Sequence, residues 1–151
     1  MDLFRYVQLL LKYRPRSEHE IRERLKSRGY DAEEIEKAIL KLSRLDLIND
    51  FNFAKYWVNY RLAINPKSQF YIGMELKRKG VSDEVIKEVF ETFESIDDKE
   101  LASKLFEKKI KSLEKIKDEQ IKKRRAYSYL IRRGFKYGLI KELMQNFFRD
   151  N

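Results

Sequence analysis

The sequence predicts an all-α protein, built from three tandem three-helix repeats that form an elongated, curved array. Composition is the first reason. Hydrophobic residues make up 42% of the 151 residues and aromatic residues 13%, which favours a folded core, whereas five Gly and two Pro disfavour a many-turned β architecture. The second reason is a short apolar block ending in glycine that occurs three times. The third is the helical spacing of apolar residues on both sides of each block, without a convincing strand pattern.

Each repeated block contains a leucine four positions before a glycine. The glycines are Gly29, Gly80 and Gly134, which lie 51 and 54 positions apart. An apolar residue eight positions before each glycine shares one helical face with that leucine. Glycine suits the position just beyond a helix end, because a left-handed backbone costs it little. Each block therefore predicts a helix that ends in a Schellman cap. The hydrophobic pairs expected across these caps are Leu25 with Tyr30, Leu76 with Val81, and Leu130 with Phe135.

Helix starts are also visible around the blocks. Ser17, three residues before Glu20, predicts a capping box at the start of the first block's helix. In the second repeat, Asn65–Pro66 predicts an N-cap followed by proline at the first helical position. The segment 82–84 (Ser-Asp-Glu) predicts a capped, acidic first turn, and Asp97–Asp98 predicts a helix N-terminus. After the first glycine, Asp31 with Glu34 predicts a capping box at the start of the next helix.

One further helix precedes each block, and one follows it. Apolar residues recur at helical spacing before the blocks in 4–11, 53–62 and 101–116. A three-helix unit of about 50 residues buries little surface alone, so neighbouring units are expected to stack. The expected repeats are residues 1–49, residues 50–96 and a basic third repeat, residues 97–151. The equivalent apolar positions thirteen residues after the glycines are Leu42, Phe93 and Phe147.

Positive charge is concentrated in the third repeat. The chain has 34 Lys and Arg against 25 Asp and Glu, a net charge of +9. Residues 104–136 contain thirteen basic and four acidic residues, so this segment accounts for the whole excess. Four of its lysines form one helical stripe, where like charges repel and a polyanion would relieve the repulsion. The alternative is an ordinary solvated helix face. The stripe is Lys104, Lys108, Lys111 and Lys115.

The segment 122–125 (Lys-Lys-Arg-Arg) is followed by two tyrosines, Tyr127 and Tyr129. Basic side chains beside aromatic rings suit a single-stranded nucleic acid, whose phosphates pair and whose bases stack. The alternative for the tyrosines is partly buried packing. A similar choice applies to the cations just before the glycines, which either stabilise helix C-termini or contact a partner. Those cations are Arg28, Lys79, Arg132 and Arg133.

Several classes of function lack support in the sequence. The absence of Cys excludes disulfides, thiolate zinc sites and a cysteine nucleophile. The single histidine, His19, is expected at the surface, with no nucleophile beside it, and Trp57 is expected in the core. We therefore expect no enzymatic activity, cofactor or metal. No apolar run is long enough to cross a bilayer, and no signal peptide is visible, so we expect a cytoplasmic protein without membrane contact.

Three blocks together resemble the RecX regulatory proteins, modulators of the RecA recombinase. They are 14–21 (RPRSEHEI) with Leu25 and Gly29, then 47–54 (LINDFNFA) with 57–58 and Arg61, then 75–81 (ELKRKGV) echoed at 130–135 (LIRRGF). The resemblance covers nearly the whole chain. The chain departs from the family in 63–68, where a glycine is usual, and in the lysine-rich segment 104–125.

The resemblance implies three three-helix units and a non-catalytic role in DNA repair, recombination and the SOS response. Such a protein lodges in the groove of the RecA–DNA filament and inhibits RecA ATPase and strand exchange. Separately, a repeat array with polar outer faces can be monomeric, so we expect a monomer. Binding to single- or double-stranded DNA is a weaker expectation, and a direct nucleic-acid-binding module acting through the basic third repeat is the alternative function. The residues expected to contact filament or DNA are Arg14, Arg16, Arg28, Arg61, Lys79, Lys123, Arg124, Arg125, Arg132 and Arg133.

Overall fold

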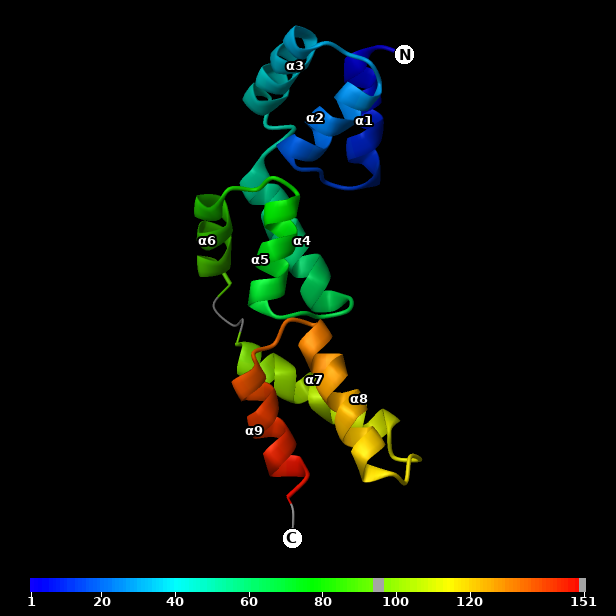
Figure 1. The fold of residues 1–151 in the computed structure, drawn as a ribbon. Helices are drawn as coiled ribbons and strands as arrows, with labels where there is room; N and C mark the ends of the chain where they lie inside the picture. Colours follow the sequence, from blue (N-terminus) through cyan, green and yellow to red (C-terminus); the bar gives the residue numbers. More distant parts are fainter. Residues whose placement is uncertain (94–96, 150–151) are drawn as a thin grey trace. The chain divides into compact units, whose positions relative to one another are not determined.

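The computed structural model describes residues 1–93 and 97–149, and the described chain contains nine α-helices and no strand (Figure 1). The prediction of an all-α fold is confirmed. The helices are α1 (Leu3–Tyr13), α2 (Glu18–Ser27), α3 (Ala32–Arg44), α4 (Asp50–Ala63), α5 (Gln69–Arg78), α6 (Asp83–Glu91), α7 (Asp98–Ser112), α8 (Glu119–Arg132) and α9 (Tyr137–Phe147).

The chain divides into two compact units. Unit 1 is formed by the described parts of 1–60 and 74–94, and unit 2 by those of 61–73 and 95–151. The predicted boundary at residue 96 lies outside the described residues.

All three predicted Schellman caps are present. Gly29, Gly80 and Gly134 have φ of +94°, +83° and +84°. In the first cap the Tyr30 N–H donates to the Leu25 carbonyl at 3.2 Å. The Gly29 N–H donates to the Lys26 carbonyl at 2.9 Å, and the other two caps repeat both bonds. A local pattern of leucine and glycine thus specifies three helix ends, because the cap's partners all lie within six residues.

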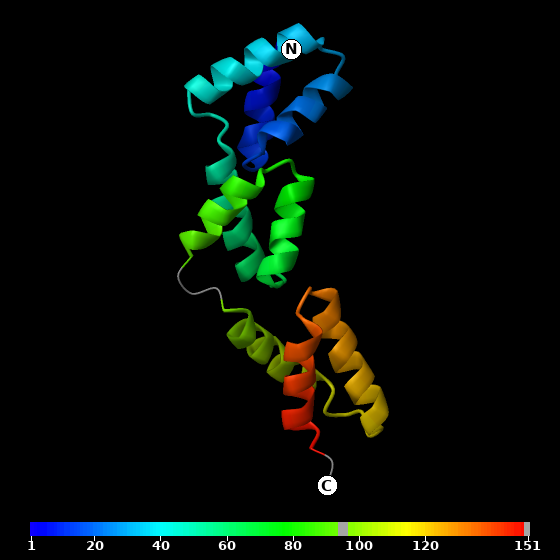
Figure 2. The same cartoon turned by 60° about the vertical axis from the view of Figure 1, so that its left-hand side comes forward.

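Each unit has its own hydrophobic core. In unit 1, the helices α1, α2 and α3 lie against one another (Figure 2). The cluster between them includes Val7, Ile21, Leu25 and Leu42, all at most 1% exposed. In unit 2, α7, α8 and α9 enclose the second cluster. The leucine before each glycine is fully buried, as the repeat pattern predicts. The core of unit 2 includes Ala102, Phe106, Ala126, Leu130 and Ile140.

The N-terminus of α2 is seated on the C-terminus of α5 within unit 1. Ser17 forms the predicted capping box with Glu20. The Ser17 hydroxyl is fully buried and also donates to the Lys79 carbonyl at 2.6 Å. Asp50, at the start of α4, accepts the Glu18 N–H at 2.9 Å. One side chain thus closes the start of α2 and the end of α5 together.

Unit 2 contains an equivalent arrangement, and it corrects one prediction. The N-cap of α5 is Ser68 rather than Asn65, because the Ser68 hydroxyl accepts the Tyr71 N–H at 3.1 Å. That hydroxyl is fully buried and donates to the Gly134 carbonyl at 2.8 Å. Asp98 accepts the Gln69 N–H at 2.9 Å. Asn65 instead has φ of +55°, which places it in a turn before the helix.

Two aromatic residues differ from their predicted positions. Phe147 is 53% exposed, whereas its neighbour Phe148 is 9% exposed and belongs to the core of unit 2. The helix α9 ends at Phe147, so the chain leaves the helical spacing there and Phe148 turns inward. Trp57 is half-buried, and its ring lies 6.1 Å from that of Phe53.

Candidate functional site

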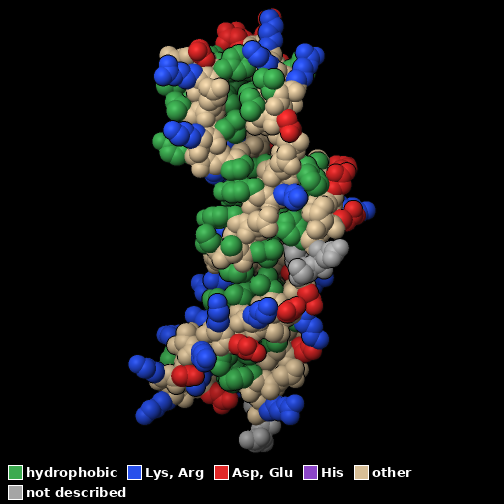
Figure 3. All heavy atoms as spheres, turned by 180° about the vertical axis from the view of Figure 1, so that it is seen from behind, with side chains coloured by type: hydrophobic (Ala, Val, Ile, Leu, Met, Phe, Trp, Pro, Cys, Tyr) green, Lys and Arg blue, Asp and Glu red, His purple; other side chains and the backbone are tan. Residues whose placement is uncertain are grey.

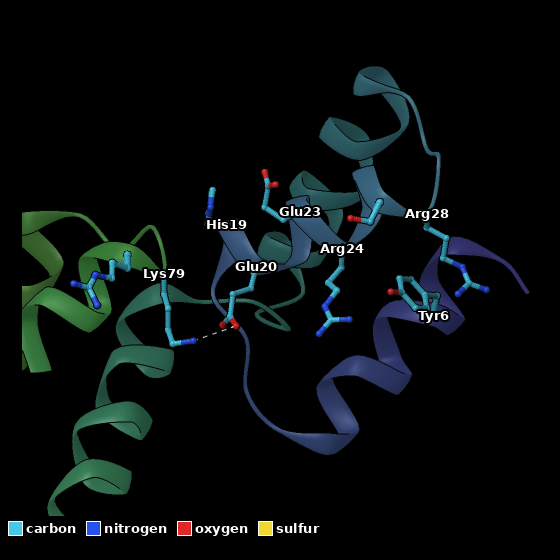
Figure 4. Close-up of a pocket in the computed structure, with 9 residues that line it drawn as sticks. Tyr6, His19, Glu20, Glu23, Arg24, Arg28 and Lys79 are labelled. Atoms are coloured by element: carbon cyan, nitrogen blue, oxygen red, sulfur yellow. Dashed lines mark ion pairs between the residues drawn. The ribbon is translucent and has the colours of Figure 1, made fainter. Parts of the chain in front are cut away.

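A basic groove runs along α2 in unit 1. Its cavity has a volume of about 540 Å³. Figure 4 draws the residues that line it. Four cations line it against two carboxylates, so the groove favours an anionic occupant. The cations are Arg24, Arg28, Arg78 and Lys79, and the carboxylates are Glu20 and Glu23. Only Arg28 and Lys79 of these cations were expected from the sequence.

The Glu20 carboxylate interacts with three other residues of unit 1. It accepts hydrogen bonds from the Arg14 guanidinium and from the Ser17 N–H, and lies 3.5 Å from the Lys79 ammonium. Partial burial would raise the pKa of Glu20, but the Arg14 and Ser17 hydrogen bonds and the Arg14 and Lys79 charges hold it below its ordinary value. Arg14 therefore serves the capping box of α2, and its charge is largely compensated within unit 1.

Two groove cations lie over aromatic rings. The Arg28 guanidinium is 4.3 Å from the Tyr6 ring centroid, and the Lys79 ammonium is 4.5 Å from the Trp57 centroid. Such stacking holds a cation in place while leaving it charged. Figure 4 shows Arg28 beside Tyr6 and Lys79 reaching toward Glu20.

Arg16 adds a further cation near the groove. Its side chain is half-buried, and its Nε has no hydrogen-bond partner. Burial and the like charges of Arg14 and Arg24 lower the pKa of Arg16. The negative charge of Glu20 opposes them, but the pKa stays below its ordinary value. An arginine remains charged under these conditions. The site thus holds concentrated positive charge that a bound anion would stabilise.

The lysine stripe of the third repeat borders a second groove, which lies in unit 2 and has a volume of about 710 Å³. Lys104, Lys108 and Lys111 line it, and Lys115 does not. Its floor is mostly apolar, and includes Leu62, Leu105, Phe106, Ile110 and Phe147. Figure 3 shows basic side chains over the visible face of the part formed by α7, α8 and α9, with acidic side chains between them.

The remaining predicted contact residues differ in exposure and in their local contacts. Arg124 and Arg125 are exposed, whereas Lys123 is half-buried with its ammonium 5.6 Å from the Phe148 ring centroid. Arg132 is exposed and donates to the Ser128 carbonyl at 3.2 Å, and Arg61 is half-buried. The predicted contact residues are therefore divided between the units: Arg14, Arg16, Arg28 and Lys79 belong to unit 1, and the other six belong to unit 2.

Arg133 and the two tyrosines have structural roles. The Arg133 guanidinium stacks 3.6 Å from the Tyr129 centroid and donates to the Asn65 side chain at 3.1 Å. Tyr127 and Tyr129 are half-buried against the core of unit 2, as the packing alternative predicts. Arg133 therefore ties the end of α8 to the turn before α5, which leaves it less available than Arg132.

Sequence reasoning missed Arg24 and Arg78, although a signal for them exists. Arg78 directly precedes Lys79 near the helix end, and Arg24 directly precedes the buried Leu25. Their shared groove depends on how α2 and α5 meet in unit 1, which the sequence pattern does not state. The structure places His19 at the surface, where it lines the same groove.

The described part of the chain holds neither a candidate metal centre nor a membrane-spanning helix. Among the described residues, no group of three or more His, Cys, Asp or Glu side chains is arranged to hold a metal ion. Within residues 1–93 and 97–149, no helix is both long and apolar enough to span a membrane. The fold and the two grooves define the class of a helical-repeat protein with basic surfaces suited to binding.

Three family models match the chain in order: the first three-helix domain of RecX over residues 6–42, the second over 49–89 and the third over 97–144. The chain therefore belongs to the RecX family of regulatory proteins, and its predicted three-helix repeats are confirmed.

Similar proteins agree with this family. The chain is 34% identical to "Regulatory protein RecX" from Amycolatopsis mediterranei over 93% of this chain and 80% of that protein. It is 28% identical to the protein of that name from Prosthecochloris aestuarii, over 89% and 85%. A crystal structure of RecX from Lactobacillus salivarius matches with a TM-score of 0.73 and 25% identity, over 95% of this chain and 93% of that one.

Proposed function

We propose that this protein binds the RecA–DNA filament and inhibits RecA ATPase and strand exchange, without chemistry of its own. Membership of the RecX family supports RecA as the target, since the family name implies regulation of RecA. The observation that carries the mode of binding is the groove of unit 1, where four cations face two carboxylates. Such a groove suits acidic side chains of a filament or the phosphates of its DNA.

Within this proposal the ten predicted residues have unequal weight. Arg16, Arg28, Arg124, Arg125 and Arg132 are the better candidates for contact, because the hydrogen bonds and ion pairs described above leave their charge largely uncompensated. Arg14 and Arg133 support the fold through Glu20 and Asn65. We further propose that the protein is a cytoplasmic monomer that functions in recombinational DNA repair. Its proposed repeats are residues 1–49, 50–96 and 97–151.

A second function, direct binding of nucleic acid, is favoured by the third repeat. Residues 104–136 carry the whole net charge of +9, and Arg124 and Arg125 are exposed there. Neutralising phosphates releases counterions, so this binding would weaken as salt rises. The proposed DNA contact and the filament contact can operate together.

The DNA proposal is tested by fluorescence anisotropy with labelled single- and double-stranded DNA over a range of salt. Replacing Arg124 and Arg125 by Gln is expected to weaken binding and flatten the salt slope by about two counterions. The matched control replaces Lys26 and Lys37 by Gln, since both are exposed surface lysines of unit 1. Equal affinity and equal slope for both double variants would contradict this second function.

A further inference from the structure

The structure contains one kind of helix joint twice. In unit 1 the start of α2 is seated on the glycine end of α5, and in unit 2 the start of α5 is seated on the glycine end of α8. The seating is close. A Cβ added to Gly80 would stand 2.3 Å from the His19 Cβ, and one added to Gly134 would stand 2.6 Å from the Ser68 Oγ. Each joint therefore requires glycine at this position, because a Cβ would collide with the start of the incoming helix.

The third glycine end has the same construction without an incoming helix. Gly29 ends α2 with φ of +94°, and a Cβ added there would meet nothing within 4 Å. Arg28 and Tyr6 stand 51 positions before Lys79 and Trp57, the same spacing as between Gly29 and Gly80. Both pairs stack a cation on a ring, at 4.3 and 4.5 Å. The end of α2 thus repeats the receiving half of the joint in unit 1.

We propose that the Arg28–Gly29 end of α2 binds the N-terminal end of an α-helix of a partner protein. That helix begins with Ser or Thr at its N-cap and carries a carboxylate three residues later. The hydroxyl would donate to a terminal carbonyl of α2, as Ser17 donates to the Lys79 carbonyl at 2.6 Å. The carboxylate would pair with Arg28, as Glu20 lies 3.5 Å from the Lys79 ammonium.

Among the described helices, α2, α5 and α6 are the ones with Ser at the N-cap, and none of them offers such an end to a second copy. Ser17 and Ser68 are fully buried in their own joints. The start of α8 is capped by Asp118, whose carboxylate cannot donate to a carbonyl. Ser82 caps α6 through the Val85 N–H, and Val85 offers no carboxylate for Arg28. Continuity with the chain's own joints therefore favours a helix of another protein.

A direct test uses the full chain labelled with ¹⁵N and a synthetic peptide of residues 14–27 (RPRSEHEIRERLKS), the segment that forms the incoming half of the joint in unit 1. At millimolar peptide, the amide signals of Arg28, Gly29 and Tyr30 are expected to shift. A peptide with Ser17→Asp, which cannot donate the hydrogen bond, is expected to shift them much less. Absence of shifts at this end, or equal shifts with both peptides, would overturn the inference.

A second test replaces Gly29 by Asn, which tolerates a left-handed backbone and puts a side chain where the incoming helix would sit. The control is Gly138→Asn in α9, where a Cβ also meets nothing within 4 Å. The inference rests on the proposed function only for the identity of the partner, RecA. Gly29→Asn is expected to raise the concentration needed to inhibit RecA ATPase on the order of tenfold, at unchanged thermal midpoint.

The two tests separate the two proposals. If the unchanged chain has no effect on RecA, the proposed function fails, and the peptide experiment alone decides the inference. If the unchanged chain inhibits RecA and Gly29→Asn inhibits equally well, the helix-end inference is overturned and the function stands. Sedimentation that shows a dimer of the unchanged chain, lost in Gly29→Asn, would assign this end to a second copy and overturn the proposal of a different partner.

Discussion

Replacing Ser17 by Ala removes both hydrogen bonds of a fully buried side-chain hydroxyl. The hydroxyl accepts the Glu20 N–H at 3.1 Å and donates to the Lys79 carbonyl at 2.6 Å. Loss of an N-cap costs about 1 kcal/mol. A part-buried carbonyl left without its donor costs a further ~1–2 kcal/mol. We therefore expect the free energy of unfolding to fall by about 2–3 kcal/mol.

The matched control is Ser82→Ala. Ser82 is exposed, and its hydroxyl caps α6 by accepting the Val85 N–H at 3.2 Å. Its loss is expected to cost about 1 kcal/mol, because only a helix cap is removed. Urea unfolding followed by circular dichroism measures both variants against the unchanged chain. Equal losses for Ser17→Ala and Ser82→Ala would refute the argument that the hydroxyl joins α2 to α5.

Two further predictions concern the same joint. The pKa of Glu20 is lowered in the folded state, so ionised Glu20 stabilises the fold. This stabilisation is fully present above the ordinary carboxyl pKa and is lost as the pH falls through the lowered pKa. The stability difference between the unchanged chain and Glu20→Gln, from urea unfolding, should shrink from pH 7 toward pH 3; a constant difference would contradict this. Gly80→Ala should destabilise more than Gly29→Ala, by an additional ~1–3 kcal/mol, because only its Cβ meets His19. Similar thermal midpoints would contradict that reasoning.

Local patterns in the sequence predict the helix ends well. The three Schellman caps follow from a leucine and a glycine a few residues apart, and all their partners are local. The N-cap of α5 was predicted at Asn65 and lies at Ser68, because a buried contact with Gly134 decides between two residues that can both cap. Competing local signals are thus resolved by residues distant in the sequence.

The candidate site was predictable only in part. The sequence shows that the basic excess lies in 104–136 and that cations precede the glycines. It does not show that Arg14 is paired with Glu20, or that Arg133 is held by Asn65. These partners come from neighbouring turns and other repeats, so the compensation of each charge depends on tertiary packing.

The central claim is that this chain inhibits RecA on DNA, and the most direct measurement is the rate of ATP hydrolysis by RecA on single-stranded DNA as this protein is added. The account predicts that the rate falls with rising concentration and reaches a plateau of inhibition, with strand exchange falling in parallel. Replacing Arg24 and Arg28 by Glu should shift the curve to higher concentration, because the groove of unit 1 would lose its positive charge. Unchanged hydrolysis and strand exchange at saturating protein would contradict the account.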